Sequence, residues 1–207
     1  MSDFDPKNLL TLAKEKPFLE VSFQYLLGRE ASQNEAQILS EMMTLVIDHG
    51  PDSPSAQATI SASKEGKDVL RSVEAGIHQI NDKHGGAIEG CAQILQLEDF
   101  DPIHLVSSAL AEGRRLPGFG HRIYKDEDPR TTYLFTRLSE LALDSGFIQK
   151  AKAIEAELEK QKGKKLVMNI DCGMAVVLSE LKIEPKLMNV FFLWPRVAGL
   201  VYRWSNI

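Results

Sequence analysis

The sequence predicts an all-α protein, and three observations carry this prediction. Apolar residues recur three and four positions apart, as at Ile38, Met42, Leu45 and Val46, which is the spacing of one face of a helix. Helix-start and helix-stop signals separate the apolar segments. No stretch has the period-two alternation of a half-buried strand, and there are no convincing repeats.

Start signals place the expected helices one after another. Ser32 and Glu35 match a capping box. Asp101-Pro102 and Asp128-Pro129 each join a capping carboxylate to a proline that the first helical turn tolerates. Pro195 should interrupt or kink the last helix. Helices are expected over residues 18–27, 35–48, from 54 or 55 onward, 67–80, 86–97, 102–111, 129–145, 147–161, 173–181 and 187–207.

Composition sets the broad class. A chain of 207 residues, 43% hydrophobic and 26% charged, can bury a substantial core in one large domain or in a large domain with a smaller lobe. Its net charge of -5 gives no overall attraction to nucleic acid or anionic membrane, so any anion must be bound by a local site.

Cellular location is read from the cysteines and the N-terminus. Cys91 and Cys172 are too few for a disulfide framework and fit no zinc spacing, which is compatible with a reducing cytosol. The N-terminal sequence has no apolar signal core, and no segment approaches the roughly 20 apolar residues that span a bilayer. We therefore expect a soluble, cytoplasmic protein with neither nucleic acid nor membrane as a partner.

The stretch from Pro117 to Arg130 is the first candidate site. Gly118 and Gly120 allow backbone conformations and close ligand approach that a side chain would block, so His121 can be presented to a pocket. Arg130 lies on the first turn of the following helix, where it and His121 can face one anionic ligand. A polar loop with a solvated histidine explains this stretch equally well.

Two further histidines stand at expected helix ends. His49 follows the helix over 35–48 in a turn-rich segment, where a cation that satisfies terminal carbonyls is the commoner explanation. His84 precedes Gly85 and Gly86, and a helix N-terminus there would keep the imidazole neutral and able to donate a hydrogen bond to a developing oxyanion. A tight helix crossing explains these glycines as well.

The C-terminal third adds charged candidates. Asp171 either caps the helix that follows or projects into a site, and capping is the commoner role. Arg196 stands in an apolar stretch, and a buried arginine demands an anionic partner. The run over 151–165 is a solvated helix face, although Lys164 and Lys165 can lie near a phosphate-bearing ligand.

The segment GFGHRIYKDEDPR resembles the citrate synthase signature, in which G-x-G-H is followed by an acid, a proline and an arginine. DHGPDSPSAQA, HGGAIEG, MNID and FFLWPRVAG extend the resemblance, in family order, over about Met42 to Gly199. The segment beginning DHGP is also similar to citryl-CoA lyases and to the citrate synthase homology region of ATP-citrate lyase. Those lyase modules commonly have another residue where this chain, like the synthases, has His84.

The resemblance implies roles for these residues. His84 would hydrogen-bond the acetyl-CoA carbonyl, Asp171 would remove a methyl proton, and His121 would polarise the oxaloacetate carbonyl. A thioester methyl is a poor acid, so its enolate must be stabilised as it forms. Oxaloacetate or citrate would be bound by His49, Arg130 and Arg196, and the candidates for binding CoA are Gly118, Gly120, Lys164 and Lys165. The resemblance implies no metal and no permanently bound cofactor, because acetyl-CoA and CoA are substrate and product.

The resemblance also implies the architecture and the partners. Residues 1–85 and 167–207 would form a large helical domain, with a smaller helical domain over 86–166 and the site in the cleft between them. Family members work as homodimers, so a homodimer or higher homo-oligomer is expected. The chain departs from the family in its length and in Tyr202-Arg203-Trp204, and it stops before the arginine that a partner subunit normally supplies. Arg203 is the candidate substitute.

Three functions fit this sequence. The first is a citrate synthase-like acyltransferase, supported by His84, His121 and Asp171 together. The second is a citryl-CoA lyase, supported by the short chain and the DHGP segment. The third is a noncatalytic protein that binds CoA or a carboxylate. The preference for acetyl-CoA over another acyl-CoA, and for oxaloacetate over another 2-oxo acid, stays open.

Overall fold

A computed structural model describes residues 8–81 and 85–206 of the chain. Helices dominate this part, and the β-bridges within it are two isolated ones, Asn81 with Gly85 and Phe119 with Met168. The all-α prediction is confirmed. The helices are α1 (Asn8–Glu15), α2 (Phe18–Leu27), α3 (Gln33–Leu45), α4 (Pro54–Lys64), α5 (Val69–Ile77), α6 (Ala87–Leu95), α7 (Pro102–Ala111), α8 (Pro129–Glu140), α9 (Phe147–Lys162), α10 (Ile170–Glu180), α11 (Pro185–Met188) and α12 (Val190–Ser205).

The predicted caps begin the helices for which they were expected. Ser32 and Glu35 form the capping box of α3, with each side chain bonded to the other residue's backbone N–H. Asp101 caps α7, and Asp128 caps α8 by accepting a hydrogen bond from Arg130 N. Local chemistry therefore determines where these helices start.

Several boundaries differ from the expectation. Helix α8 ends at Glu140 rather than near residue 145, and Ala142 in the following turn adopts a left-handed conformation with φ 56°. Helices α1 and α11 were not expected. Helix α12 runs through Pro195 as one element from Val190 to Ser205. Its packing against α3, α4, α5 and α11 stabilises a helix that propensity alone would interrupt.

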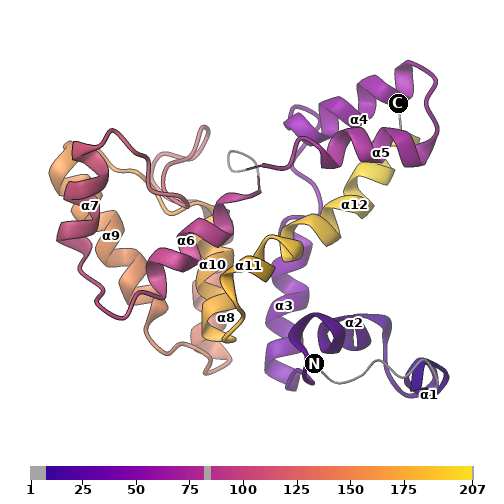
Figure 1. Ribbon diagram of the computed structural model, residues 1–207, viewed down its shortest axis with the longest axis horizontal. Helices are drawn as coiled ribbons and strands as arrows, with labels where there is room; N and C mark the ends of the chain where they lie inside the picture. Colours follow the sequence, from indigo (N-terminus) through magenta and orange to yellow (C-terminus); the bar gives the residue numbers. More distant parts are fainter. Residues whose placement is uncertain (1–7, 82–84, 207) are drawn as a thin grey trace.

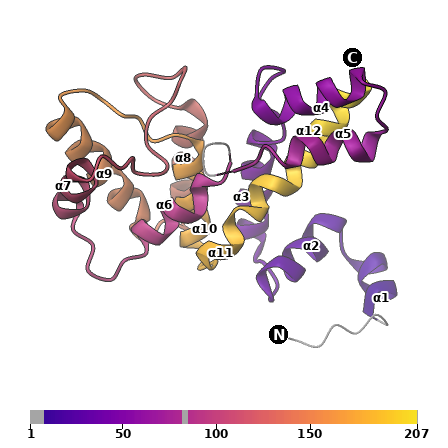
Figure 2. The same cartoon turned by 45° about the horizontal axis from the view of Figure 1, so that its top comes forward.

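The helices form two groups that both views separate (Figure 1, Figure 2). In one group α10 packs against α6, α8 and α9, and α7 packs against α9. In the other group α4, α5 and the C-terminal half of α12 pack on one another. Helix α3 lies between the groups and contacts α8, α10 and α12.

The core is centred on α10. Every residue from Cys172 to Ser179 is buried, because the sequence of this helix is apolar or small all round and neighbours cover each face. Asp171 lies on its first turn. A rigid, fully packed helix therefore carries one of the predicted site residues.

Candidate active site

The loop that carries His121 is attached to the segment leading into α10. Gly120 N donates to Val167 O at 2.7 Å, and Asn169 N donates to Gly118 O at 2.9 Å. The side chain of Asn169 adds a bond from Nδ2 to Gly120 O at 3.0 Å. These bonds connect the backbone before His121 to the start of the helix that bears Asp171.

The two loop glycines are needed for different reasons. Both have positive φ, 85° at Gly118 and 93° at Gly120, a region that other residues rarely adopt. A Cβ atom on Gly118 would lie 2.7 Å from Cys91 Sγ and 3.0 Å from Cys172 Cβ, so Gly118 packs against two buried thiols. A Cβ atom on Gly120 would meet only Leu166, at 3.7 Å.

His121 is held as a neutral imidazole with a defined tautomer. Its Nδ1 accepts backbone N–H bonds from Ile123 and Tyr124, both at 3.0 Å. A nitrogen that accepts carries no proton, so in the neutral ring the proton is on Nε2. Burial lowers the His121 pKa, and Arg130 opposes protonation as well, while Asp128 acts in the opposite sense. The ring therefore presents an N–H donor to the site.

Arg130 connects the two histidines. Its Nη1 lies 3.2 Å from His49 Nδ1, and its Nη2 lies 3.5 Å from His121 Nε2. The guanidinium is itself held by the buried carboxylate of Asp128, with Nε to Oδ1 at 3.0 Å and Nη2 to Oδ2 at 2.7 Å. This fork-to-fork geometry fixes the plane of the arginine. His49 follows the C-terminal end of α3, whose C-cap is Val46. Its contact with Arg130 places it in this cluster.

Asp171 does not cap α10, and the capping prediction was wrong. The cap is Asn169, whose Oδ1 accepts from Asp171 N at 3.0 Å and from Cys172 N at 3.3 Å. No described residue donates a hydrogen bond to the Asp171 carboxylate. Burial raises its pKa to about 6, although the positive charges of Arg130 and Arg196 oppose this shift. The carboxylate of Asp171 takes no part in capping α10.

Arg196 is buried, as its apolar sequence context predicted. Its Nε and Nη2 donate to Val46 O at 3.0 and 2.9 Å, and Nη1 donates to Ser55 Oγ at 3.4 Å. The guanidinium lies 4.5 Å from the ring centroid of Phe192. Burial lowers the Arg196 pKa to about 10, opposed by the negative charges of Asp48 and Asp171.

The anionic partner predicted for Arg196 is not found among residues 8–81 and 85–206, where no carboxylate forms an ion pair with it. A carbonyl, a hydroxyl and an aromatic face satisfy the group instead. A buried cation without a counter-charge in contact favours binding of an anion nearby.

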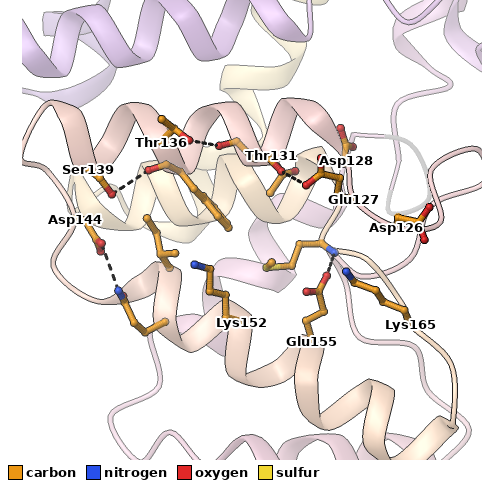
Figure 3. Close-up of a pocket in the computed structure, with 15 residues that line it drawn as sticks. Asp126, Glu127, Asp128, Thr131, Thr136, Ser139, Asp144, Lys152, Glu155 and Lys165 are labelled. Atoms are coloured by element: carbon orange, nitrogen blue, oxygen red, sulfur yellow. Dashed lines mark hydrogen bonds between the residues drawn. The ribbon is translucent and has the colours of Figure 1, made fainter.

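The two candidate lysines line different cavities. Lys164 lines a cavity of about 420 Å³ that adjoins His121 and Gly120. Lys165 lines a separate groove of about 410 Å³ between α8 and α9. Figure 3 shows Lys165 with Glu155 on the side of that groove opposite Thr136. The cavity that adjoins His121 is strongly basic, and its cationic lining residues are Arg114, Arg115, Arg122, Lys162 and Lys164.

His84 lies outside the described residues, but its neighbour Gly85 is described. Gly85 has φ 76°, and a Cβ atom there would lie 2.1 Å from the ring of Phe192. Phe192 thus packs between Gly85 and the guanidinium of Arg196. Close packing against Phe192 is sufficient to explain a glycine at position 85, since no side chain fits there.

Sequence reasoning missed three contributors to the site. Asn169 was not recognised as a cap, although an Asn directly before an apolar helical segment is a common cap signal. The Arg114-Arg115 pair precedes the glycine loop and gave no periodic signal. Asp128 was assigned only as a cap, although it also binds the Arg130 side chain.

Comparisons with known proteins agree with the signature. A family model described as "Citrate synthase, C-terminal domain" matches residues 7–206. A citrate synthase of Haloferax volcanii is 30% identical over 188 residues, covering 87% of this chain and 49% of that protein. A probable ATP-citrate synthase of Dictyostelium discoideum is 30% identical over 182 residues, covering 77% of this chain and 28% of that protein. The chain thus spans about half the length of the first relative and less of the second.

The solved structures include a similar fold of comparable size. The citryl-CoA lyase of Hydrogenobacter thermophilus has a TM-score of 0.89 and 33% sequence identity, covering 96% of this chain and 78% of that chain. This likeness extends over nearly the whole described chain. None of the helices described here combines the length and apolarity that a membrane-spanning helix needs.

Proposed function

The chain belongs to the citrate synthase family, and on this premise we propose that it is a citrate synthase-type acyltransferase. It would condense acetyl-CoA with oxaloacetate to citryl-CoA and then release citrate and CoA. The observation that carries the proposal is the contact of Arg130 with both His49 and His121, together with the carboxylate of Asp171, whose pKa burial raises to about 6 against the positive charge of Arg130. These groups supply an anion site, a carbonyl-polarising donor and a base.

Oxaloacetate binding follows from the donors that converge at Arg130. The planar guanidinium of Arg130 suits a carboxylate, and Asp128 holds its plane. His121 Nε2 lies 3.5 Å from Arg130 Nη2, so its N–H can donate to the ketone oxygen of a substrate bound at Arg130. His49 and the buried charge of Arg196 complete the proposed binding site for the dianion.

The carbon–carbon bond forms after proton transfer to Asp171. This carboxylate takes a proton from the acetyl methyl group, and its pKa near 6 leaves it ionised and adequately basic at neutral pH. We propose that His84 stabilises the enolate oxygen. The enolate carbon then attacks the ketone carbon, and His121 with Arg130 stabilises the negative charge that develops on the ketone oxygen. This oxygen takes up a proton to become the hydroxyl group of citryl-CoA, while Asp171 gives up the proton that it removed from the methyl group. Water then cleaves the thioester and releases CoA.

We propose that the CoA phosphates bind in the basic cavity that adjoins His121. Lys164 and Gly120 line it, whereas neither Gly118 nor Lys165, the other predicted CoA-binding residues, does so. Five cationic side chains give this cavity a local positive potential in a chain whose net charge is -5.

The second candidate function is citryl-CoA cleavage to acetyl-CoA and oxaloacetate. The similarity to the Hydrogenobacter citryl-CoA lyase favours it, since that chain is of comparable length. The same residues serve, with protonated Asp171 returning the proton to the acetyl carbon. A noncatalytic role in CoA or carboxylate binding is the third reading.

One experiment separates the three. The purified protein is incubated with acetyl-CoA and oxaloacetate, and separately with citryl-CoA, and the products are followed by mass spectrometry. Citrate and free CoA from the first mixture support a synthase. Acetyl-CoA and oxaloacetate from citryl-CoA, without citrate, support a lyase. Ligand binding without turnover in either mixture supports the third function.

Domain organisation and assembly are parts of the same proposal. We propose a large domain formed by residues 1–85 and 167–207 and a small domain formed by residues 86–166, and the mutual packing of α4, α5 and α12 supports the first grouping. Helix α10 packs against α6 and α8, so the two domains would meet along it. We further propose that the protein is cytoplasmic and that it forms a homodimer. Sedimentation analysis would test the homodimer.

A further inference from the structure

One face of α12 contacts the residues directly before His49. Arg196, Gly199 and Arg203 are three and four positions apart, so they lie on the same side of the helix. Arg196 donates twice to Val46 O. A Cβ atom on Gly199 would lie 1.9 Å from Ile47 O, which shows how closely the backbone approaches the helix there.

Arg203 extends the contact of α12 with this segment to Asp48, the residue after Ile47. Its Nε donates to Asp48 Oδ1 at 3.2 Å, and its Nη2 donates to Asp48 Oδ2. Only 21% of the Arg203 side chain and 31% of the Asp48 side chain are exposed, so solvent screens the pair less than a surface ion pair. The bond to Arg203 is the largest cause of the lowered pKa of Asp48.

Asp48 extends the connection past His49. Its Oδ2 also accepts a hydrogen bond from Gly50 N at 3.3 Å. One carboxylate is therefore bonded to the residue after His49 and to α12. His49 is the residue between Asp48 and Gly50, and its Nδ1 lies 3.2 Å from Arg130 Nη1.

We propose that Arg203 is a positioning residue for His49 in oxaloacetate binding, acting through the carboxylate of Asp48. The inference rests on the proposed function. Arg203 does not touch the substrate; it orders residues 48–50, which present the His49 ring to Arg130. Arg203 therefore supports the site of its own chain, and its ion pair with Asp48 competes with any role as a substitute for a partner subunit's arginine.

Steady-state kinetics of the condensation, with KM measured separately for oxaloacetate and for acetyl-CoA, test the inference. Arg203→Gln should raise KM for oxaloacetate about tenfold, while kcat changes less than about threefold and KM for acetyl-CoA stays constant, since the binding energy that is lost is common to the ground state and the transition state. Arg203→Lys should recover part of the affinity, because it keeps the charge but not the fork geometry. The control is Arg71→Gln, an arginine whose side chain is 76% exposed and whose contact with Asp68 is 4.0 Å long.

A double-mutant cycle separates positioning from general stability. If Arg203 acts through Asp48, Arg203→Gln should add little to Asp48→Asn in KM for oxaloacetate. Equal rises in both KM values, or additive effects of the two substitutions, would overturn the inference. Thermal unfolding of each variant checks that the protein remains folded at the assay temperature.

A readout that needs no turnover keeps this inference separate from the proposed function. Imidazole ¹⁵N spectra of the histidines, with His49 assigned from its loss in His49→Gln, should show altered His49 ring signals in Arg203→Gln. The signals of the exposed His104 should not change. Unchanged His49 signals in a folded Arg203→Gln variant overturn the inference, whereas absent turnover with altered His49 signals counts against the proposed function alone.

Discussion

Nη2 of Arg130 lies 3.5 Å from Nε2 of His121, and both nitrogens carry hydrogen-bond donors. Two backbone N–H groups occupy His121 Nδ1, so the neutral ring cannot accept from Arg130 at Nε2. The two donors therefore do not bond to each other. An oxygen atom within reach of both would accept from both, and a charge developing on it would be stabilised by groups that are already oriented.

The first prediction concerns His121. We expect His121→Ala to lower kcat about a hundredfold or more, because one preorganised donor to the ketone oxygen is lost. Steady-state kinetics, run in whichever direction the enzyme proves active, measures this. His104→Ala is the control, because His104 is exposed on α7 and does not line the cavity that adjoins His121. Activity of the His121 variant within threefold of the unmodified protein would refute the assigned role.

The second prediction concerns the base. Asp171→Asn should reduce kcat about a thousandfold while leaving oxaloacetate binding largely intact, since the amide cannot take the proton. In the unmodified protein, the rate of the condensation should rise with pH up to about 6 and then level off. A pH profile with no inflection near 6, or a turnover unaffected by the substitution, would contradict the assignment.

The same carboxylate predicts a pH-dependent stability difference. The Asp171 pKa is raised from 3.8 to about 6 on folding, so the folded state binds more protons between these values. The contribution of this group to stability is therefore complete below about pH 4 and is lost as pH rises through 6. As pH rises from 4 to 7, the free energy of unfolding of Asp171→Asn should increase by on the order of 1–2 kcal/mol relative to that of the unmodified protein. Urea unfolding of both proteins at pH 4 and pH 7 measures this difference. The same difference in free energy of unfolding at the two pH values would contradict the prediction.

The third prediction separates backbone strain from packing. Gly113 and Gly118 both have positive φ, but a Cβ atom meets nothing within 4 Å at Gly113, whereas at Gly118 it would clash with Cys91. Gly113→Ala should cost about 1 kcal/mol from strain alone. Gly118→Ala should cost about 2–4 kcal/mol and lower activity, because overpacking displaces the loop that holds His121. Equal free energies of unfolding for the two variants would show that the clash is relieved locally.

The fourth prediction uses the two adjacent lysines as a matched pair. Lys164→Gln should raise KM for acetyl-CoA several-fold, and raising the salt concentration should reduce the difference from the unmodified protein, because Lys164 lines the basic cavity next to His121. Lys165→Gln should leave that KM nearly unchanged, because Lys165 lines the groove between α8 and α9. A larger rise in KM for acetyl-CoA in Lys165→Gln than in Lys164→Gln would indicate that CoA binds in the groove between α8 and α9 instead.

Sequence alone determined the fold class, most helix starts and the family. Caps such as Ser32 and Asp128 act on backbone groups two or three residues away, so they are legible along the chain. The motifs around His49, His121 and Arg130 named residues that the structure brings into contact. The role of each residue and the domain division stay predictions.

Only the tertiary structure decided what surrounds these residues. Asn169 takes the cap of α10 and leaves the Asp171 carboxylate free of that role, adjacent lysines line different cavities, and Arg203 reaches Asp48 across 155 positions of sequence. Helical periodicity specifies which face of a helix is apolar but not which distant segment that face will meet. Those contacts depend on how α12 and α10 pack against the rest of the chain, and they set the environment of His49 and the pKa of Asp171.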